Sequence, residues 1–157
     1  MLGMNPESRA HALFESHKPG RGFGSPDGTQ STFQITLWDE KRARDLPDGG
    51  HLSRTVVTQS YRGAMIGRSS VEYLMVHHPD HSATFVGIEH FSGTIQGRPG
   101  TCLLQHAGSF QGRAALSRWT VIPGSGTDGL KGIAGNGSFV VGLHGAATVI
   151  FEPDFSD

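Results

Sequence analysis

The sequence has 157 residues, of which 17% are charged, and its formal net charge is −1. A chain of this length fits one domain with a hydrophobic core of its own. The scattered charge gives no basic surface for nucleic acid, and there is neither a signal-peptide pattern nor a run of 18 apolar residues. We therefore expect a soluble cytoplasmic protein that binds neither nucleic acid nor membrane.

Residues 1–31 differ in composition from the rest of the chain. The stretch "NPESRAHALFESHK" begins with Asn5 and Pro6, which favour a helix start, but a helix this short is marginal alone. The following "PGRGFGSPDGTQST" is rich in Gly, Pro, Ser and Asp, the composition of a linker. We expect residues 1–31 to be a flexible N-terminal extension and residues 32–157 to form the folded domain.

From Thr32 onward the apolar residues recur with a period of two, which predicts β-strands. In "STFQITLWDE", Phe33, Ile35 and Leu37 alternate with polar residues. Further candidate strands are residues 52–65, 68–78, 84–95, 101–111, 115–123, a run after residue 130, and 146–155. Asn136-Gly137 is typical of a two-residue turn in the run after residue 130. About eight short strands with no long helix indicate an antiparallel barrel or a sandwich.

Glycine and cysteine contents refine this fold class. The 23 glycines are roughly twice the usual share of about 7%, and they interrupt the apolar runs, as kinked strands of a small barrel require. The single cysteine, Cys102, excludes an internal disulfide and is expected to be a small buried hydrophobe.

Other polar motifs predict loops rather than cofactor sites. "HHPDHS" contains His77, His78 and His81, but its composition predicts a solvated hairpin tip. No cysteine ligand or HExxH motif accompanies it, so we expect no metal. "GSGTDGLKG" lacks the GK[ST] ending of a phosphate-binding loop, and no GxSxG motif is present. The sequence therefore predicts no cofactor.

Four stretches of the sequence resemble the bacterial DUF3224 family. They are "WDE" (38–40), "FVGIEHFSGTIQGRPG" (85–100), "LLQHAGSF" (103–110) and "WTVIPGSGTDGLKGIAGNG" (119–137). The resemblance covers roughly residues 32–155 and implies a fold similar to the allene oxide cyclase barrel, an eight-stranded antiparallel β-barrel with a lumen. It assigns no function, because the family is named for having none, and fold analogy to an isomerase is only associational.

The hairpin at residues 84–111 carries the main candidate site, Glu89 and His106. With Gly97-Arg98 as its turn, the numbers of paired residues sum to 195, so that Glu89 faces His106. A one-residue slip would place Gln105 on the Glu89 face instead, and the sequence leaves both registers open. A buried carboxylate beside an imidazole suits general acid–base chemistry, although a structural cross-strand pair has the same sequence pattern.

These residues predict a small-molecule-binding barrel, with three alternatives for its function. In the first, a cofactor-independent isomerase or cyclase acts on a small hydrophobic or aromatic metabolite in the lumen, with Glu89 and His106 as catalytic residues. The expected ligand-binding residues are Tyr61, Glu72, Phe85, Phe91, Gln105, Phe110 and Trp119. The alternatives are a non-catalytic carrier or sensor of a small hydrophobic ligand, and a filled barrel that acts as an oligomerisation module. In each case we expect a homo-oligomer.

Overall fold

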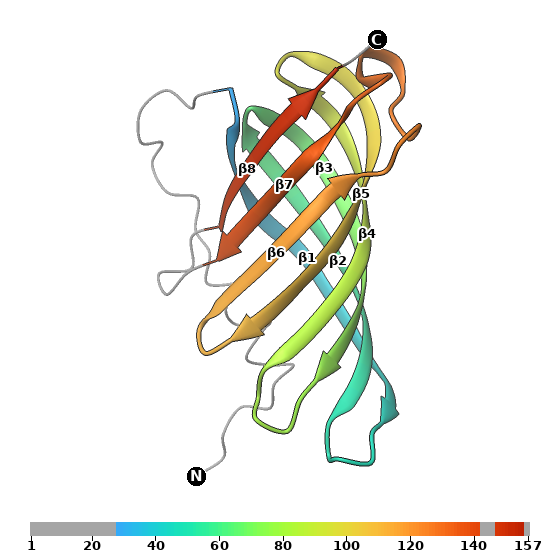
Figure 1. The fold of residues 1–157 in the computed structure, drawn as a ribbon, viewed down its shortest axis with the longest axis vertical. Helices are drawn as coiled ribbons and strands as arrows, with labels where there is room; N and C mark the ends of the chain where they lie inside the picture. The colour runs from blue at the N-terminus through green and yellow to red at the C-terminus, as the bar shows by residue number, and fades with distance from the viewer. Residues whose placement is uncertain (1–27, 142–146, 156–157) are drawn as a thin grey trace.

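The computed structural model describes residues 28–141 and 147–155 (Figure 1). Their strands are β1 (Gln30–Asp45), β2 (His51–Gly63), β3 (Met65–His77), β4 (Ala83–Ile95), β5 (Arg98–Gln111), β6 (Ala114–Val121), β7 (Ala134–Val141) and β8 (Ala147–Asp154), with a short 3-10 helix, η1 (Asp128–Leu130), between β6 and β7. Each strand pairs antiparallel with the next, and β8 pairs with β1, so the sheet closes on itself. The predicted all-β fold, an eight-stranded antiparallel barrel, is confirmed.

The N-terminal extension predicted for residues 1–31 lies outside the described residues except for its last four. Two of these four, Gln30 and Ser31, already belong to β1. Within the described ranges, no helix has the length and apolar character needed to span a membrane.

The strands differ in length, and this makes the two ends of the barrel unlike. β1 to β5 have 13 to 16 residues each, whereas β6, β7 and β8 have 8 each. β8 pairs with β1 only from Gln30 to Thr32. Among the described strands, the remainder of β1 pairs with β2 alone, and the β1–β2 hairpin extends beyond the short strands (Figure 1). Within the described ranges, the end of the barrel formed by the β1–β2 hairpin therefore has an unpaired sheet edge along β1, and we call it the open end.

A β-bulge in β1 changes which side chains face the interior. The register against β2 shifts between Ile35 and Leu37. A bulge inserts one residue, so the side chains that follow it move to the opposite face. The alternation predicted from the sequence was therefore wrong at Leu37, which is 49% exposed. Beyond the bulge, Trp38 and Glu40 are partly buried instead.

Aromatic side chains from all eight strands fill the interior. They are Phe33, Tyr61, Tyr73, Phe85, Phe91, His106, Trp119, Phe139 and Phe151. Neighbouring rings lie 4.6 to 6.2 Å apart between centroids, mostly edge-to-face or tilted, the arrangements that aromatic pairs prefer. Cys102 is buried among these side chains as predicted, and burial raises the pKa of its thiol to about 12.

Three of the interior rings lie against a glycine on the neighbouring strand. The pairs are Tyr73 with Gly87, Phe85 with Gly108, and Trp119 with Gly137. A Cβ atom at any of these glycines would come within 2.6 Å of the ring that faces it. Glycine therefore lets a wide ring lie flat against the wall, and it allows the strong coiling that a small closed barrel needs.

The β4–β5 hairpin is paired two residues away from the predicted register. Its turn is Gln96-Gly97, both with positive φ (51° and 81°), which is the conformation of the tight hairpin turn that follows strand twist. Paired residue numbers therefore sum to 193, as in Ile95 opposite Arg98. A shift of two residues leaves every side chain on its original face, so Glu89 and His106 still share the inner face.

The Asn136-Gly137 dipeptide does not form the predicted turn. Both residues lie within β7, and the chain reverses instead between β6 and β7, where η1 is placed. Gly137 is part of a strand because it provides the flat surface beneath the Trp119 ring.

Gly137→Ala is expected to lower the free energy of unfolding by about 1–3 kcal/mol, the usual cost of overpacking a filled core. The added methyl group would lie 2.2 Å from Trp119 Cζ2. Urea unfolding followed by circular dichroism measures the change. In a Trp119→Phe background, which lacks the ring atoms that the methyl group meets, Gly137→Ala should cost less. Equal costs in the two backgrounds would contradict the packing explanation.

Candidate functional site

The predicted pair Glu89 and His106 lies inside the barrel. The two residues are diagonal neighbours on β4 and β5, because Glu89 is directly opposite Leu104 and His106 is opposite Gly87. His106 Nε2 lies 2.6 Å from Glu89 Oε1, and both side chains are buried. Because an ionised carboxylate can only accept a hydrogen bond, Nε2 of the imidazole is the donor in this contact.

Hydroxyl groups on neighbouring strands complete the hydrogen bonds of this pair. The Tyr61 hydroxyl donates to Glu89 Oε2 at 2.5 Å, and Ser117 Oγ lies 2.7 Å from His106 Nδ1. A buried charged pair is tolerated only when its remaining lone pairs and protons find partners. The pair is therefore held by β2, β4, β5 and β6 together.

The pair also controls the protonation of its neighbours. Burial by itself raises the pKa of Glu89, but the hydrogen bond and charge of His106 outweigh this effect and hold the pKa below its usual value. Burial, and next the charge of Glu89, raise the pKa of Tyr61 and of Tyr73 well above the ordinary value. At neutral pH the carboxylate is ionised and both phenols keep their protons.

Ser117, His106 and Glu89 form a hydrogen-bonded row of the kind found in serine hydrolases. However, Ser117 is completely buried, so its hydroxyl is not positioned to attack a substrate that arrives from solvent. The row can relay a proton within the interior, which is the chemistry that remains open to it.

The aromatic residues predicted to line a ligand site are part of the packed interior. Tyr61, Phe85, Phe91, Phe110 and Trp119 are all buried. Tyr61 packs against the Phe91 ring. Trp119 on β6 packs against the rings of His106 on β5 and Phe151 on β8. In this structure their contacts are with other side chains of the barrel, and these side chains occupy the middle of the lumen.

Glu72 and Gln105, the other two predicted ligand-binding residues, lie on the outer wall. Both are exposed and flank Ile88, which pairs directly with each of them. All three line an open groove of about 1560 Å³ across the outside of the barrel. The structure therefore separates these two residues from Glu89 and His106 by the thickness of the wall.

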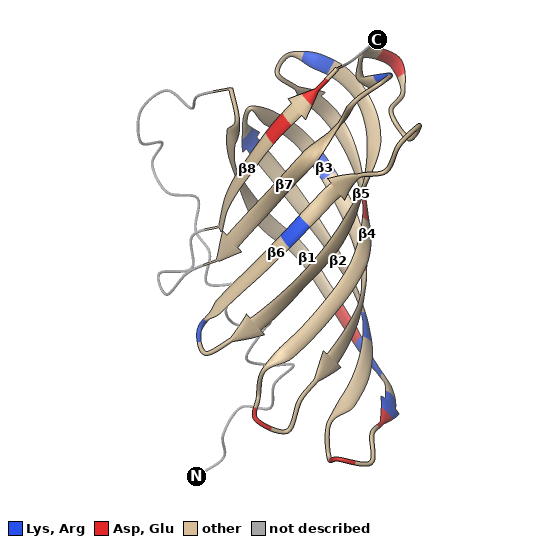
Figure 2. Ribbon diagram, in the orientation of Figure 1, with Lys and Arg blue, Asp and Glu red and all other residues tan. Residues whose placement is uncertain are grey.

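Two adjacent rows of directly paired residues line this outer groove, and both cross from β2 to β8. One row runs from Arg54 to Ile150, and the other from Val56 to Glu152. The part of the groove on β3 and β4 is apolar, formed by the exposed side chains of Leu74, Val86 and Ile88. Charges of both signs are interspersed along the described strands rather than gathered by sign (Figure 2).

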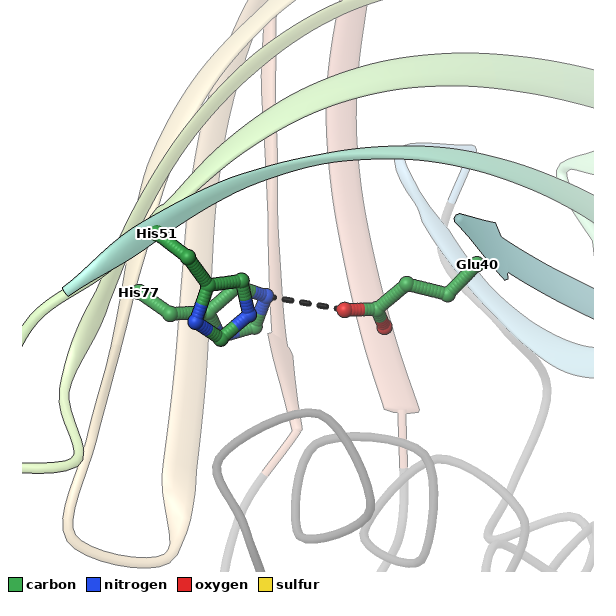
Figure 3. Close-up of side chains that lie close together, drawn as sticks. All are labelled: Glu40, His51 and His77. Carbon is green, nitrogen blue, oxygen red and sulfur yellow. Dashed lines mark ion pairs between the residues drawn. The ribbon is translucent and has the colours of Figure 1, made fainter. Parts of the chain in front are cut away.

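A third group of polar residues, not predicted from the sequence, lies at the open end of the barrel. Glu40 on β1, His51 on β2 and His77 on β3 each offer one ligand atom, and these atoms lie within 4.8 Å of one another (Figure 3). We refer to these three residues as the barrel-end cluster. His77 was expected in a solvated loop, and this was wrong: it is the last residue of β3 and is fully buried.

A family described as "Protein of unknown function (DUF3224)" matches residues 29–152, and the chain therefore belongs to this family. The crystal structure of a protein of unknown function from the DUF3224 family of Shewanella oneidensis MR-1 is similar in fold, with a TM-score of 0.72 and 25% sequence identity. The alignment covers 82% of this chain and 96% of that one. No curated protein matches the chain. The resemblance to DUF3224 is confirmed, whereas the likeness to the allene oxide cyclase barrel stays a prediction.

Glu89 is expected to make the folded state less stable in acid. The pKa of Glu89 is lower in the folded state than the ordinary value of 4.5 that applies to the unfolded chain. The ionised carboxylate therefore stabilises the fold above pH 4.5, and this stability is lost as the pH falls through the pKa of the folded state. Glu89→Gln should reduce the free energy of unfolding at neutral pH by about 1–3 kcal/mol and flatten its decrease in acid. Urea titrations at a series of pH values measure both effects.

The matched control for this experiment is Glu72→Gln, because Glu72 is exposed on the outer wall. Its stability should stay within about 0.5 kcal/mol of wild type at every pH. A Glu89→Gln profile parallel to that of wild type would show that the buried carboxylate is not linked to acid unfolding.

Proposed function

We propose that this DUF3224 protein binds a small, mostly apolar molecule in the outer groove, without converting it. The observation that carries the proposal is the contrast between the two sides of the wall. Rings from every strand occupy the interior, whereas the outer side has an open groove of about 1560 Å³ with exposed apolar side chains on β3 and β4. A ligand can enter this groove without displacing a core residue.

The floor of the groove favours an apolar ligand. Leu74 and Val86 are direct cross-strand partners, and Ile88 lies next to Val86 on the same face of β4. Covering exposed apolar surface is worth roughly 25 cal/mol per Å². Contiguous apolar patches with polar rims are typical of binding surfaces, whereas single exposed apolar residues are ordinary.

Polar side chains beside the floor provide the means of orienting a ligand. Arg54 pairs with Leu74, and Glu72 and Gln105 flank Ile88. Guanidinium, carboxylate and amide groups together can hydrogen-bond a hydroxyl, carbonyl or carboxylate on an otherwise apolar molecule. These groups are exposed, so they serve recognition rather than the proton transfer expected of a buried pair.

The wild-type protein is expected to enhance the fluorescence of 1-anilinonaphthalene-8-sulfonate, an apolar anionic dye, by binding it in the groove. Ile88→Glu should weaken dye binding at least about fivefold, since the dye would bury a carboxylate and meet a like charge. Ile66→Glu is the matched control, because Ile66 is also an exposed isoleucine of the outer wall (57% against 42% for Ile88) but does not line the groove. Equal losses in the two variants would refute groove binding.

Self-association is the alternative use of the same face, and the same variants test it. The groove residues include Arg54 and Arg118 as well as Glu72 and Glu152, so the face has charges that two copies can pair across a twofold axis. Light scattering gives the oligomeric state. An oligomer that Ile88→Glu dissociates and Ile66→Glu preserves would assign the groove to a second copy of the chain instead of a ligand.

A second candidate function is proton transfer by Glu89 and His106 in the lumen. It is supported by a buried hydroxyl group that lacks a hydrogen-bond partner. The Tyr73 hydroxyl is buried and has no hydrogen-bond partner among the described residues. Its ring packs edge-on against His106, with centroids 5.8 Å apart. Buried polar groups without a partner are rare, and they often mark functional sites. A carbonyl or hydroxyl of a small substrate would satisfy this group, provided that the surrounding rings move to admit it.

Under this second function, Tyr73→Phe should leave the free energy of unfolding unchanged or raise it, because it removes an unsatisfied polar atom. Glu89→Gln and Tyr73→Phe should each slow the incorporation of deuterium from D₂O into small aromatic carbonyl compounds at least about tenfold, as measured by mass spectrometry. Wild-type protein that incorporates no more deuterium than buffer, or variants as active as wild type, would remove these residues from any proton transfer.

A further inference from the structure

We propose that Glu40, His51 and His77 form a binding site for one divalent transition-metal ion, such as Zn²⁺, at the open end of the barrel. The three residues come from three consecutive strands, and their ligand atoms lie within 4.8 Å of one another (Figure 3). This site is separate from the outer groove and from the pair of Glu89 and His106.

The chemistry of the donor set selects the class of ion. Two imidazole nitrogens and one carboxylate oxygen suit Zn²⁺ and other first-row divalent ions, whereas Mg²⁺ and Ca²⁺ prefer oxygen ligands alone. Three protein ligands leave at least one coordination position for water or a bound molecule, which is the composition of catalytic rather than structural zinc sites. The site would therefore hold an ion with an exchangeable ligand.

One donor separation in the cluster already matches that around a coordinated ion, whereas the stacked histidine rings must turn for both nitrogens to face the same ion. His77 Nε2 and Glu40 Oε2 are 2.9 Å apart, and two donors that each lie about 2.0–2.2 Å from one ion have a similar separation. His51 and His77 are direct cross-strand partners with stacked rings, 4.5 Å between centroids and 17° between planes. Figure 3 shows the carboxylate of Glu40 pointing toward the two stacked rings.

Two buried atoms of this cluster lack hydrogen-bond partners among the described residues. Glu40 Oε2 is at ion-pair distance from His77 but outside hydrogen-bond geometry, and His77 Nδ1 has no partner. The side chains are nonetheless 6% and 1% exposed, respectively. A buried polar atom without a partner costs free energy, so the pair needs a further ligand. An ion bound to Glu40 Oε2 supplies it for the carboxylate.

The neighbours of Glu40 hold its carboxylate in a metal-binding orientation. Trp38 Nε1 donates to Glu40 Oε1 at 3.0 Å, which leaves Oε2 directed at the histidines. Ser53 Oγ lies 3.2 Å from His77 Nε2, and an ion at this nitrogen would take the place of that contact. Ligating carboxylates are commonly fixed by such outer hydrogen bonds, and losing one typically weakens metal binding by about 10–100-fold.

The position of the cluster provides a route for the ion. Glu40 lies on the part of β1 that pairs with β2 but not with β8 among the described strands. The site is therefore beside an open sheet edge rather than under the rings that fill the middle of the barrel. Within the described ranges, an ion that enters along this edge does not have to pass the packed rings.

The test uses the full chain without an affinity tag, freed of metal by a chelator and titrated with Zn²⁺ in a calorimeter. We expect one ion per chain, and at least about tenfold weaker binding in Glu40→Gln and in His77→Gln. Glu72→Gln and His90→Gln are matched controls, because both residues are exposed on the outer wall, and they should bind as wild type does. No binding to wild type, or undiminished binding to both ligand variants, would overturn the proposal.

A second measurement on the wild-type chain covers the case in which a variant does not fold. Paramagnetic Co²⁺ in the site would lie next to the indole of Trp38 and should quench its fluorescence in proportion to the sites filled. Diamagnetic Zn²⁺ should displace Co²⁺ and reverse the quenching, and Trp38→Phe should remove the quenched component. Co²⁺ that binds without quenching Trp38 would place the ion elsewhere and overturn the proposal.

Discussion

The closed barrel must be filled from within, and this constraint organises the rest of the structure. Eight strands enclose a space just wide enough for side chains. Here the space is filled with aromatic rings, which provide much apolar area from few residues. Three of these rings, Tyr73, Phe85 and Trp119, find room because the residue directly opposite each on the neighbouring strand is a glycine.

The buried pair of Glu89 and His106 depends on this packing and also directs it. A carboxylate in a dry interior is unfavourable unless it is paired and hydrogen-bonded, and Tyr61 and Ser117 supply those bonds from two further strands. Four strands must therefore be in register before the polar groups are satisfied. We infer that the pair penalises slipped registers that an apolar interior of rings alone would tolerate.

The fold was predictable from the sequence because period-two alternation, turn chemistry and glycine content all indicate a small antiparallel barrel. The shared inner face of Glu89 and His106 was predictable for a related reason: the error at the Gln96-Gly97 turn shifted the register by two residues, and a shift of two preserves the face. The sequence around Glu89 does not reveal that this residue is buried, because Glu72 lies in a similar run of alternating residues and is exposed.

The barrel-end cluster was not predictable, because it depends on a β-bulge and on unequal strand lengths. The bulge after Ile35 moves Glu40 to the inner face, and neither glycine nor proline marks it in the sequence. His77 stands at the start of a run of turn residues, yet β3 includes it as its last residue and places it opposite His51. The proposed ligand site and the proposed metal site both lie outside the filled middle of the barrel, in the outer groove and at the end where β1 extends past β8. A long strand edge without a partner among the described strands is unfavourable, and holding the carboxylate of Glu40 against the two histidines is a physical reason for the chain to keep it.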